Sequence, residues 1–233
     1  MICYAWLRYL PRLLLNRITL SRAMTEIRLE VLAKKIIPSN VSHQVLFAGS
    51  VQGRGSEWVL AKHLGSQARV VTANIDGQSH IQADLSNAWP FHSGVFNLVV
   101  STWVLEHISQ PQIFLREACR VLKDTGVLIL TVPFIQRIHA SPFDYWRFTD
   151  TALRELAERA GFRQVNIIPI GGTPFLCAVA LLWPIFRIPL MGALLTLLAA
   201  LGDGILTVVA RMLGKGLDLV KTYPISFVVI ARK

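Results

Sequence analysis

Two histidines in the middle of the chain, His107 and His139, are candidates for a general base. An imidazole can take a proton from a hydroxyl group near neutral pH. The second histidine opens a polar and aromatic stretch in which Asp144 and Arg147 could bind a polar acceptor, and arginine favours phosphate or carboxylate. Two aromatic residues of the same stretch could stack on a ring or a sugar, namely Tyr145 and Trp146.

Each of these residues also has a purely structural interpretation. His107 could cap a helix or orient the neighbouring Glu106, and Asp144 and Arg147 could form a pair that only folds its loop. The two aromatic side chains could simply pack. No cluster of metal-ligand type stands out, and the three cysteines contain no CxxC, so we expect neither a metal site nor a disulfide framework. A reducing compartment is the default for such a chain.

A glycine-rich turn follows the first predicted strand. Gly49, Gly53 and Gly55 come directly after the apolar run Val45–Ala48. Glycine at this place lets the backbone approach a ligand closely and lets the next helix begin beneath it. The glycine spacing alone is weak evidence, and it gains value from the motifs that follow it.

From Val41 onward the chain alternates strands and helices. The predicted strands are 45–48, 69–73, 81–83, 96–101, 127–132, 165–169 and 226–231. The predicted helices are 56–64, 109–123 with Gly126 as its end, and 151–160 with Thr149 or Asp150 as its cap. This order predicts a doubly wound α/β fold with a mostly parallel, seven-stranded sheet covered on both faces. Ligands bind beyond the carboxyl ends of such strands, so functional residues should follow strands one, two, four and five.

Several ordered motifs carry a resemblance to a known family. They are the glycine turn, Ala83-Asp84-Leu85, the strand 96–101, the segment Val104-Leu105-Glu106-His107 and the helix 111–123. This series resembles the class I S-adenosylmethionine methyltransferases, in the type 11-like subgroup with a VLEH segment. The stretch 139–149 is similar to the H-x-x-P-x-D-Y-W-R-F-T loop of that subgroup. The resemblance covers roughly residues 41–170 and 223–233, and it implies a Rossmann-like fold with S-adenosyl-L-methionine as cofactor.

The resemblance also implies a set of cofactor-binding residues. They are Gly49, Ser50, Gly53, Asn74, Asp84, Leu85, Ser101 and Trp103. The two glycines would border the methionine part of the cofactor, Asn74 its ribose, and Asp84 the adenine amino group. Leu85 would touch the adenine ring, and the last two residues would line the pocket after strand four.

Four positions depart from the family pattern, at Phe47, Val51, Asn74 and Asn97. Three of them lack a carboxylate, and at position 51 a β-branched side chain disfavours positive φ. A catalytically inactive, methyltransferase-like binding or scaffold protein is therefore the alternative. The intact Asp84, Glu106 and His107 favour the enzyme. A nicotinamide-dependent oxidoreductase is disfavoured because the turn lacks G-x-G-x-x-G spacing.

The net charge of +10 and the pI of about 10.1 point to an anionic partner. Nucleic acid is not expected, because no zinc-finger spacing, RNA-binding aromatic signature or basic low-complexity arm is present. Basic charge beside strongly apolar segments fits an anionic membrane surface better. The excess of apolar residues lies after Pro174.

The domain boundaries follow from this distribution. We predict a basic amphipathic helical region over 1–40, a methyltransferase domain over 41–173 and 223–233, and an apolar helical insertion over 174–222. The strand 226–231 must pair with the sheet that precedes the insertion, so a single crossing of a bilayer would leave it on the wrong side. The insertion should therefore lie in the interface, dip in and return, or cross an even number of times.

These expectations combine into one prediction. The chain should be an S-adenosylmethionine-dependent methyltransferase for a membrane-proximal or lipid-linked small molecule or glycan intermediate. It should work at the cytoplasmic face of a membrane as a peripheral or monotopic protein. A protein partner that covers the insertion is the alternative to lipid.

Overall fold

The computed structural model describes residues 19–37, 43–51, 53, 55–76, 78–140, 142–171, 173–182, 191–214 and 218–233. These residues form two compact units. The larger unit takes the described residues of Leu29–Pro133, Ile138–Ile168 and Phe227–Lys233. The smaller unit takes those of Met1–Arg28, Phe134–Arg137 and Pro169–Ser226.

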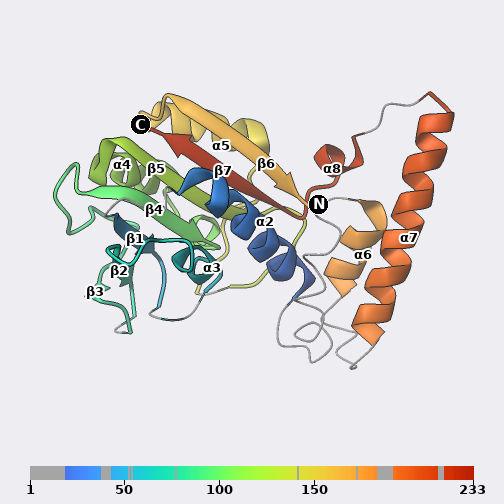
Figure 1. Cartoon of the computed structure of the whole chain (residues 1–233), viewed down its shortest axis with the longest axis horizontal. Coiled ribbons are helices and arrows are strands. Elements are labelled where there is room, and N and C mark those ends of the chain that lie inside the picture. The colour runs from blue at the N-terminus through green and yellow to red at the C-terminus, as the bar shows by residue number, and fades with distance from the viewer. Residues whose placement is uncertain are drawn as a thin grey trace. The chain divides into compact units, whose positions relative to one another are not determined.

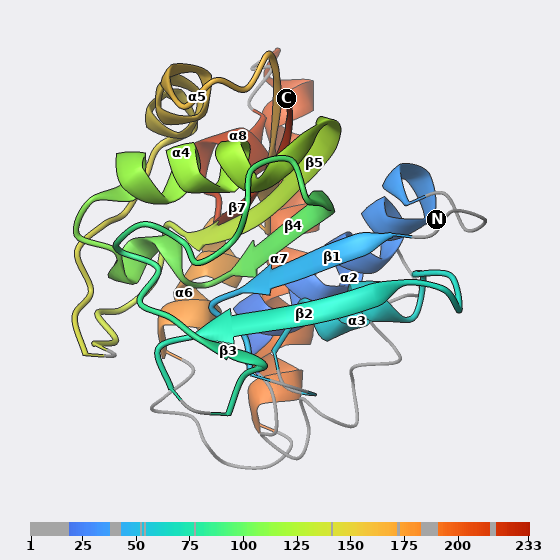
Figure 2. The same cartoon turned by 90° about the vertical axis from the view of Figure 1, so that its left-hand side faces the viewer.

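Four parallel strands carry the candidate site: β1 (Gln44–Ala48), β2 (Arg69–Asn74), β3 (Ile81–Gln82) and β4 (Phe96–Thr102). β1 lies between β2 and β4, so Val45 is opposite Val70 on one side and Leu98 on the other. β1 and β4 are almost wholly buried, as expected for apolar runs in a parallel sheet that is covered on both faces. β2 and β3 follow on one side of β1, and β4 and the later strands lie on its other side, so the order of the strands reverses at β1. Figure 2 shows β1, β2 and β4 side by side. Ligands bind at such a switch point, beyond the carboxyl ends of the strands.

The other half of the sheet consists of β5 (Leu122–Pro133), β7 (Ser226–Arg232) and β6 (Gln164–Ile170), in the overall order β3-β2-β1-β4-β5-β7-β6. β7 is antiparallel to β6, since Arg163 N donates to Arg232 O and Ile225 N donates to Ile170 O. The two arrows point in opposite directions in Figure 1. The predicted doubly wound, mostly parallel sheet of seven strands is confirmed.

Helices cover both faces of this sheet. α4 (Pro111–Val121) and α5 (Asp150–Arg159) lie on one face, and α3 (Trp58–Ala61) lies on the other, as Figures 1 and 2 show. The predicted cap of α5 is confirmed, because the Thr149 side chain accepts a hydrogen bond from Ala152 N. α3 is shorter than the predicted helix 56–64.

The predicted end of α4 at Gly126 was wrong. α4 ends at Val121, β5 begins at the next residue, and Gly126 lies inside that strand. A Cβ atom at Gly126 would lie 2.8 Å from Leu122 Cδ2 and 2.8 Å from Lys123 O. Glycine is needed there for a close approach within β5 and not to end a helix.

The smaller unit contains the start of α2 (Leu20–Ile36) with α6 (Pro174–Leu182), α7 (Met191–Met212) and α8 (Leu219–Thr222). Leu20, Ala23 and Ile27 of α2 pack against apolar residues of α6, among them Leu176. Of the predicted N-terminal helical region, residues 1–18 lie outside the described residues. So do Pro184, Arg187, Pro189 and Lys215 of the insertion.

A buried acid stands in the middle of the apolar helix α7. Asp203 is 4% exposed, and its carboxylate accepts hydrogen bonds from Phe175 N and Leu176 N and from the Thr173 hydroxyl. These donors include the first backbone amides of α6, which have no partner within their own helix. Asp203 therefore caps α6 from the neighbouring helix, which explains a charge at this place.

α7 has an unusual distribution of side-chain sizes. The residues it buries are small, Gly192, Ala199, Asp203 and Ala210. Most of its large apolar residues face outward and are between 37% and 81% exposed, at Met191, Leu194, Leu197, Leu198, Leu201, Ile205, Val208, Val209 and Met212, whereas Leu195 and Leu206 are half-buried. Among the described helices, only the stretch Leu194–Met212 is long and apolar enough to cross a bilayer, with a mean hydropathy of 1.7 and 17% of it buried.

Candidate functional site

A buried carboxylate joins the carboxyl ends of β1 and β4. Glu57 precedes α3, is 3% exposed, and accepts hydrogen bonds from the hydroxyls of Ser50 and Thr102. Ser50 follows β1, and Thr102 ends β4, so the carboxylate lies at the switch point of the sheet. Sequence reasoning proposed Ser50 and missed Glu57. The only signal for it was an acid two residues after Gly55, at the start of a predicted helix.

The backbone after β4 is strained. Trp103 has φ of 59°, and it is the only non-glycine residue with positive φ in the described part of the chain. Such a conformation costs about 1–3 kcal/mol, and it clusters at ligand-binding and active sites. Trp103 was predicted to line the cofactor pocket, and its place directly after β4 agrees with that prediction.

Buried polar atoms without a hydrogen-bond partner gather at the same end of the sheet. They are Ser101 Oγ, Trp103 Nε1 and Thr131 Oγ1, from the carboxyl ends of β4 and β5. Orphaned buried groups are costly, so a bound polar molecule that supplies partners would stabilise this end of the sheet. The residues present thus fit a polar cofactor; the cofactor-binding roles of Ser101 and Trp103 stay predictions, and Thr131 is a further candidate.

The glycine turn has the backbone that the sequence predicted. Gly49, Gly53 and Gly55 have φ of 81°, 72° and 106°, a region that suits glycine. A Cβ atom at Gly49 would overlap the methyl groups of Val104. Val51 does not have a positive φ, so the backbone strain expected of a β-branched residue at this position does not arise. The three glycines absorb the left-handed conformations, and the β-branched residue between them is unstrained.

Two other departures from the family pattern are structural. Phe47 is fully buried, and its ring meets that of Trp58 edge-on with centroids 5.2 Å apart. Asn97 Oδ1 accepts hydrogen bonds from Gln44 N at 3.0 Å and Lys123 Nζ at 3.1 Å. Asn97 therefore holds the amino end of β4, opposite to the end that carries the site.

The residues predicted to bind adenosine follow β2 and β3. Asn74 ends β2, and its Oδ1 accepts a hydrogen bond from Ile75 N at 2.8 Å, so that Nδ2 is the atom suited to donate to a ribose. Asp84 is exposed and accepts hydrogen bonds from Ser86 N and Asn87 Nδ2. Leu85 is 4% exposed. The roles of these residues in binding adenosine stay predictions.

An ion pair anchors the segment that carries the adenine-binding candidates. Glu117 accepts hydrogen bonds from Trp89 N at 2.7 Å and from Arg120 Nε at 2.8 Å. Trp89 Nε1 in turn donates to Leu85 O at 3.2 Å. The hydrogen bond from Arg120 lowers the pKa of Glu117; desolvation opposes it, and the Trp89 amide adds to it. α4 thereby holds the turn that begins at Asp84.

We expect Glu117→Gln to lower the free energy of unfolding by roughly 1–2 kcal/mol near neutral pH, because a charge-assisted network becomes neutral. The folded-state pKa of Glu117 is lowered, so its contribution is present above the unfolded value of about 4.3 and is lost as the pH falls below it. Urea unfolding at several pH values measures this. The two proteins should converge as the pH falls through the lowered folded-state pKa of Glu117, and a gap that stays constant with falling pH would contradict the assignment.

A second cluster contains both predicted bases. His107 Nε2 and His139 Nε2 each lie 3.7 Å from Glu106 Oε1, and the two rings are edge-on with centroids 5.2 Å apart. The Glu106 side chain is fully buried, and neither of its oxygens has a hydrogen-bond partner among the described residues. The sequence expectation that no metal-ligand cluster exists needs correction. Ligand atoms of these three residues all lie within 4.8 Å of one another, close enough to hold an ion.

The loop between β5 and α5 supports this cluster. Asp144 accepts hydrogen bonds from Arg147 and from His139 N, and it lies 3.3 Å from His139 Nδ1. The Arg147 guanidinium holds the pKa of Asp144 far below its usual range, while desolvation opposes this shift and the His139 amide adds to it. This pairing favours the interpretation in which Asp144 and Arg147 fold the loop. Their predicted catalytic and substrate-binding roles stay predictions.

The two aromatic candidates differ in their surroundings. Tyr145 is 47% exposed, and its backbone N donates to Glu106 O at 2.8 Å. Trp146 donates through Nε1 to Ile108 O at 2.9 Å and stacks on Phe148. Trp146 is therefore partly packed, whereas the Tyr145 ring is open to a ligand.

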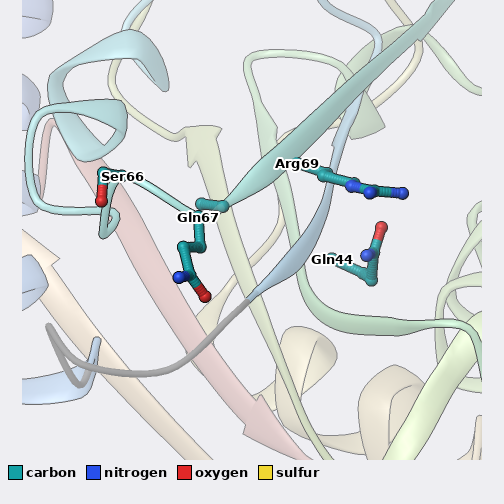
Figure 3. Close-up of a pocket in the computed structure, with 5 residues that line it drawn as sticks. Gln44, Ser66, Gln67 and Arg69 are labelled. Carbon is teal, nitrogen blue, oxygen red and sulfur yellow. The ribbon is translucent and has the colours of Figure 1, made fainter.

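A cavity of about 590 Å³ lies at the other end of the sheet. Its lining is Gln44, Ser66, Gln67, Ala68 and Arg69. Figure 3 shows Gln44 and Arg69 where β1 and β2 begin, with Ser66 and Gln67 in the turn before β2. Parallel sheets bind ligands at the carboxyl ends of their strands. We therefore assign the function to the opposite end, where the strained and unpartnered groups lie.

Comparisons with known proteins agree with this placement. The family model described as "Methyltransferase domain" matches residues 49–130, from the glycine turn into β5. No curated protein matches the sequence.

Several solved structures share the fold. An S-adenosylmethionine-dependent methyltransferase from Archaeoglobus fulgidus has a TM-score of 0.58 at 14% identity, with 91% of this chain and 94% of that chain covered. Phosphoethanolamine N-methyltransferase 2 from Haemonchus contortus has a TM-score of 0.57 at 16% identity, covering 88% of this chain and 52% of that one. The [4+2]-cyclase SpnF has a TM-score of 0.55 at 18% identity, covering 88% and 80%. At these identities the likeness shows the fold alone.

The family match spans the glycine turn that follows β1, the carboxyl ends of β2 and β4, and the Glu106–His107 segment. The sheet has the strand order and the antiparallel seventh strand described above, and its solved relatives include methyltransferases. Residues 49–130 therefore match the methyltransferase-domain family, and the sheet has the fold of class I S-adenosylmethionine-dependent methyltransferases.

Proposed function

We propose that this methyltransferase acts on a membrane-proximal or lipid-linked acceptor, a small molecule or glycan intermediate, while α7 lies in the lipid interface. The observation that carries the proposal is the packing of α7, whose fully buried described residues are small and most of whose large apolar residues are exposed. In water these exposed apolar side chains would be unfavourable, because burying a leucine or isoleucine side chain contributes about 1.5–3 kcal/mol of free energy that an exposed one does not gain.

The contacts of α7 with α6 resemble helix packing in lipid. Gly202 lies against Phe175, where a Cβ atom would meet the ring carbon Cδ2 at 3.2 Å. Small residues at a helix interface allow close approach, and helices in membranes associate in this way while large apolar residues face the lipid. By contrast, α4 of the larger unit buries its large residues, including Phe114 and Leu115. The difference between the two helices favours lipid around α7.

The loop beside the histidine cluster suits an acceptor with an apolar or ring part. Ile138 is 80% exposed, Phe143 is 59% exposed, and Tyr145 is open to solvent on the same loop. The backbone of this loop contacts the cluster, since Phe143 O lies 2.5 Å from His107 Nδ1 and Tyr145 N donates to Glu106 O. An amphiphile could thus place its chain or ring on the loop and its polar group at the cluster. S-adenosylmethionine supplies the electrophilic methyl group, and the residues at the carboxyl ends of β1 and β4 would hold it.

Charge and cysteine chemistry support the cytoplasmic face. The net charge of +10 favours anionic lipid, and Arg211 and Lys221 flank the apolar helix in the smaller unit. Cys119 and Cys177 are buried free thiols, as expected in a reducing compartment.

Vesicle flotation tests the membrane part of the proposal. The full chain should float with vesicles that contain anionic lipid and should stay bound at high salt. Ile205→Asn should lower the partition coefficient by roughly tenfold or more, because one outward apolar side chain is lost. Ile75→Asn is the matched control, since Ile75 is 63% exposed in the larger unit and Ile205 is 66% exposed on α7. A wild-type chain that stays below the vesicles at low salt would refute membrane binding.

Labelled methyl transfer tests the acceptor. The purified chain is incubated with methyl-labelled S-adenosylmethionine and a total lipid extract, and the organic phase is counted after extraction. We expect label in that phase. Transfer only to water-soluble acceptors would contradict a lipid-linked substrate while leaving the methyltransferase assignment intact.

A further inference from the structure

We propose that Glu106, His107 and His139 bind a divalent transition-metal ion of the zinc type, with one coordination position open to the methyl acceptor. The binding site rests on geometry alone. Only its use, to hold the acceptor's oxygen, rests on the proposed function.

The three ligand atoms are arranged for one ion. Glu106 Oε1 lies 3.7 Å from Nε2 of His107 and 3.7 Å from Nε2 of His139. In a tetrahedral site with bonds near 2.0–2.1 Å, ligand atoms are about 3.3 Å apart. Ligand atoms of the three residues all lie within 4.8 Å of one another, so side-chain movements of up to roughly an ångström would bring all three into the first coordination sphere.

The other nitrogen of each imidazole is already held by an acceptor. His107 Nδ1 lies 2.5 Å from Phe143 O, and His139 Nδ1 lies 3.3 Å from Asp144 Oδ2. A proton on each Nδ1 leaves the Nε2 lone pairs directed toward Glu106. Metal-binding histidines almost always donate their second N–H to a carbonyl or a carboxylate in this way. With Nδ1 as the donor, each of the two histidines can offer Nε2 as a metal ligand.

Glu106 supplies an independent reason. Its carboxylate is fully buried, and both oxygens lack a hydrogen-bond partner among the described residues. The nearby Arg147 guanidinium is paired with Asp144. A buried carboxylate without a hydrogen-bond partner is costly, and buried charges in proteins are paired or coordinate metals. A divalent cation between Glu106 Oε1 and the two imidazoles would remove this cost.

The donor set selects the kind of ion. Two imidazoles and one carboxylate suit zinc and its neighbours in the first transition row, whereas magnesium and calcium prefer oxygen ligands. Three protein ligands with an open position are typical of catalytic rather than structural zinc sites. The exposed loop residues Phe143 and Tyr145 border the histidines, so an acceptor bound there could reach the open position.

The metal would change the role of the predicted bases. A hydroxyl bound to the ion loses its proton to water more readily, because the cation stabilises the oxyanion. That oxygen then attacks the methyl carbon, the carbon–sulfur bond breaks, and its electron pair stays on sulfur to give S-adenosylhomocysteine. His107 and His139 act here as ligands rather than as proton acceptors.

Cobalt titration of the full chain tests the site without any acceptor. The chelator-treated protein is titrated with Co²⁺, and the visible absorption of low-coordinate cobalt is recorded, with Mg²⁺ as a comparison. We expect one Co²⁺ per chain and displacement by Zn²⁺. His107→Gln, His139→Gln and Glu106→Gln should each weaken binding by more than the roughly 10- to 100-fold that loss of an outer partner costs. His92→Gln, an exposed histidine outside the cluster, should bind as the wild type does.

Thermal unfolding of each variant shows whether weaker binding comes from loss of a metal ligand or from failure to fold. The titration of the wild type tests the site even if a variant does not fold. Absence of the cobalt spectrum in the wild type would overturn the site, as would full binding by folded His107→Gln and His139→Gln. If labelled methyl transfer continues after a chelator has removed the metal, the metal has no role in catalysis, and the proposed function is unaffected. If the chain binds the metal but does not methylate lipid, the metal site is kept and the proposed lipid-linked acceptor is contradicted.

Discussion

Gly49→Ala is expected to lower the free energy of unfolding by roughly 2–5 kcal/mol and to abolish measurable binding of S-adenosylmethionine. The left-handed backbone at this position costs an alanine about 1–2 kcal/mol. The new methyl group would overlap the Val104 side chain, and overpacking costs about a further 1–3 kcal/mol. Urea unfolding and calorimetric titration with the cofactor measure the two effects.

Gly53→Ala is the matched control for this change. Its φ of 72° carries a similar backbone cost, but no described atom lies within 4 Å of the added Cβ. We expect a loss of about 1–2 kcal/mol, with cofactor binding weakened rather than abolished. Equal losses in the two variants would show that contact with Val104 does not contribute.

Glu57→Gln is expected to weaken binding of S-adenosylmethionine by roughly 10- to 100-fold while changing the stability by less than about 1 kcal/mol. The cofactor carries positive charge on its sulfonium and ammonium groups, and Glu57 is the buried carboxylate at the carboxyl ends of β1 and β4. A hydrogen bond or contact with a charged partner contributes about 1.5–3 kcal/mol. Glutamine keeps the shape and loses the charge.

Two comparisons make this result specific. S-adenosylhomocysteine lacks the sulfonium charge, so its affinity should fall less than that of S-adenosylmethionine in the same variant. Glu155→Gln changes an exposed carboxylate on α5 and should leave both affinities unchanged. If S-adenosylmethionine and S-adenosylhomocysteine lost affinity equally, Glu57 would act on the amino group that both ligands share, or only on the conformation of the glycine turn. Unchanged binding of both would remove Glu57 from the site.

The features that the sequence predicted well are local. Apolar β-branched runs such as 96–101 identify buried strands, since side-chain periodicity and strand length are properties of a short segment. The glycines at 49, 53 and 55 likewise indicated left-handed backbone, because the positive φ values that a residue can adopt depend on the residue itself. Strand–helix alternation then restricted the chain to one architecture, and with it the edge of the sheet where ligands bind.

The composition of the site depends on contacts between distant segments. Glu57 meets Thr102 only because β1 and β4 are neighbours, and no spacing in the sequence announces that hydrogen bond. Glu106 and His139 come from loops after different strands, so a metal-ligand group was invisible to a search for motifs. Val51 was misjudged because a turn can distribute its positive φ values among several glycines, and the folded backbone decides which residues take them.

Helix α7 also combines a feature that the sequence predicted with one that only the tertiary structure decided. Its apolar composition was plain in the sequence, but leucines occur around much of the helix, and periodicity did not say which side is buried. Packing against α6 decided this, because Asp203 had to reach the first amides of α6 and only small residues allow so close an approach. The chain encodes where strands, turns and apolar helices lie, since those are short-range preferences. Which side chains meet, and which are left for a ligand or a membrane, follows from long-range packing.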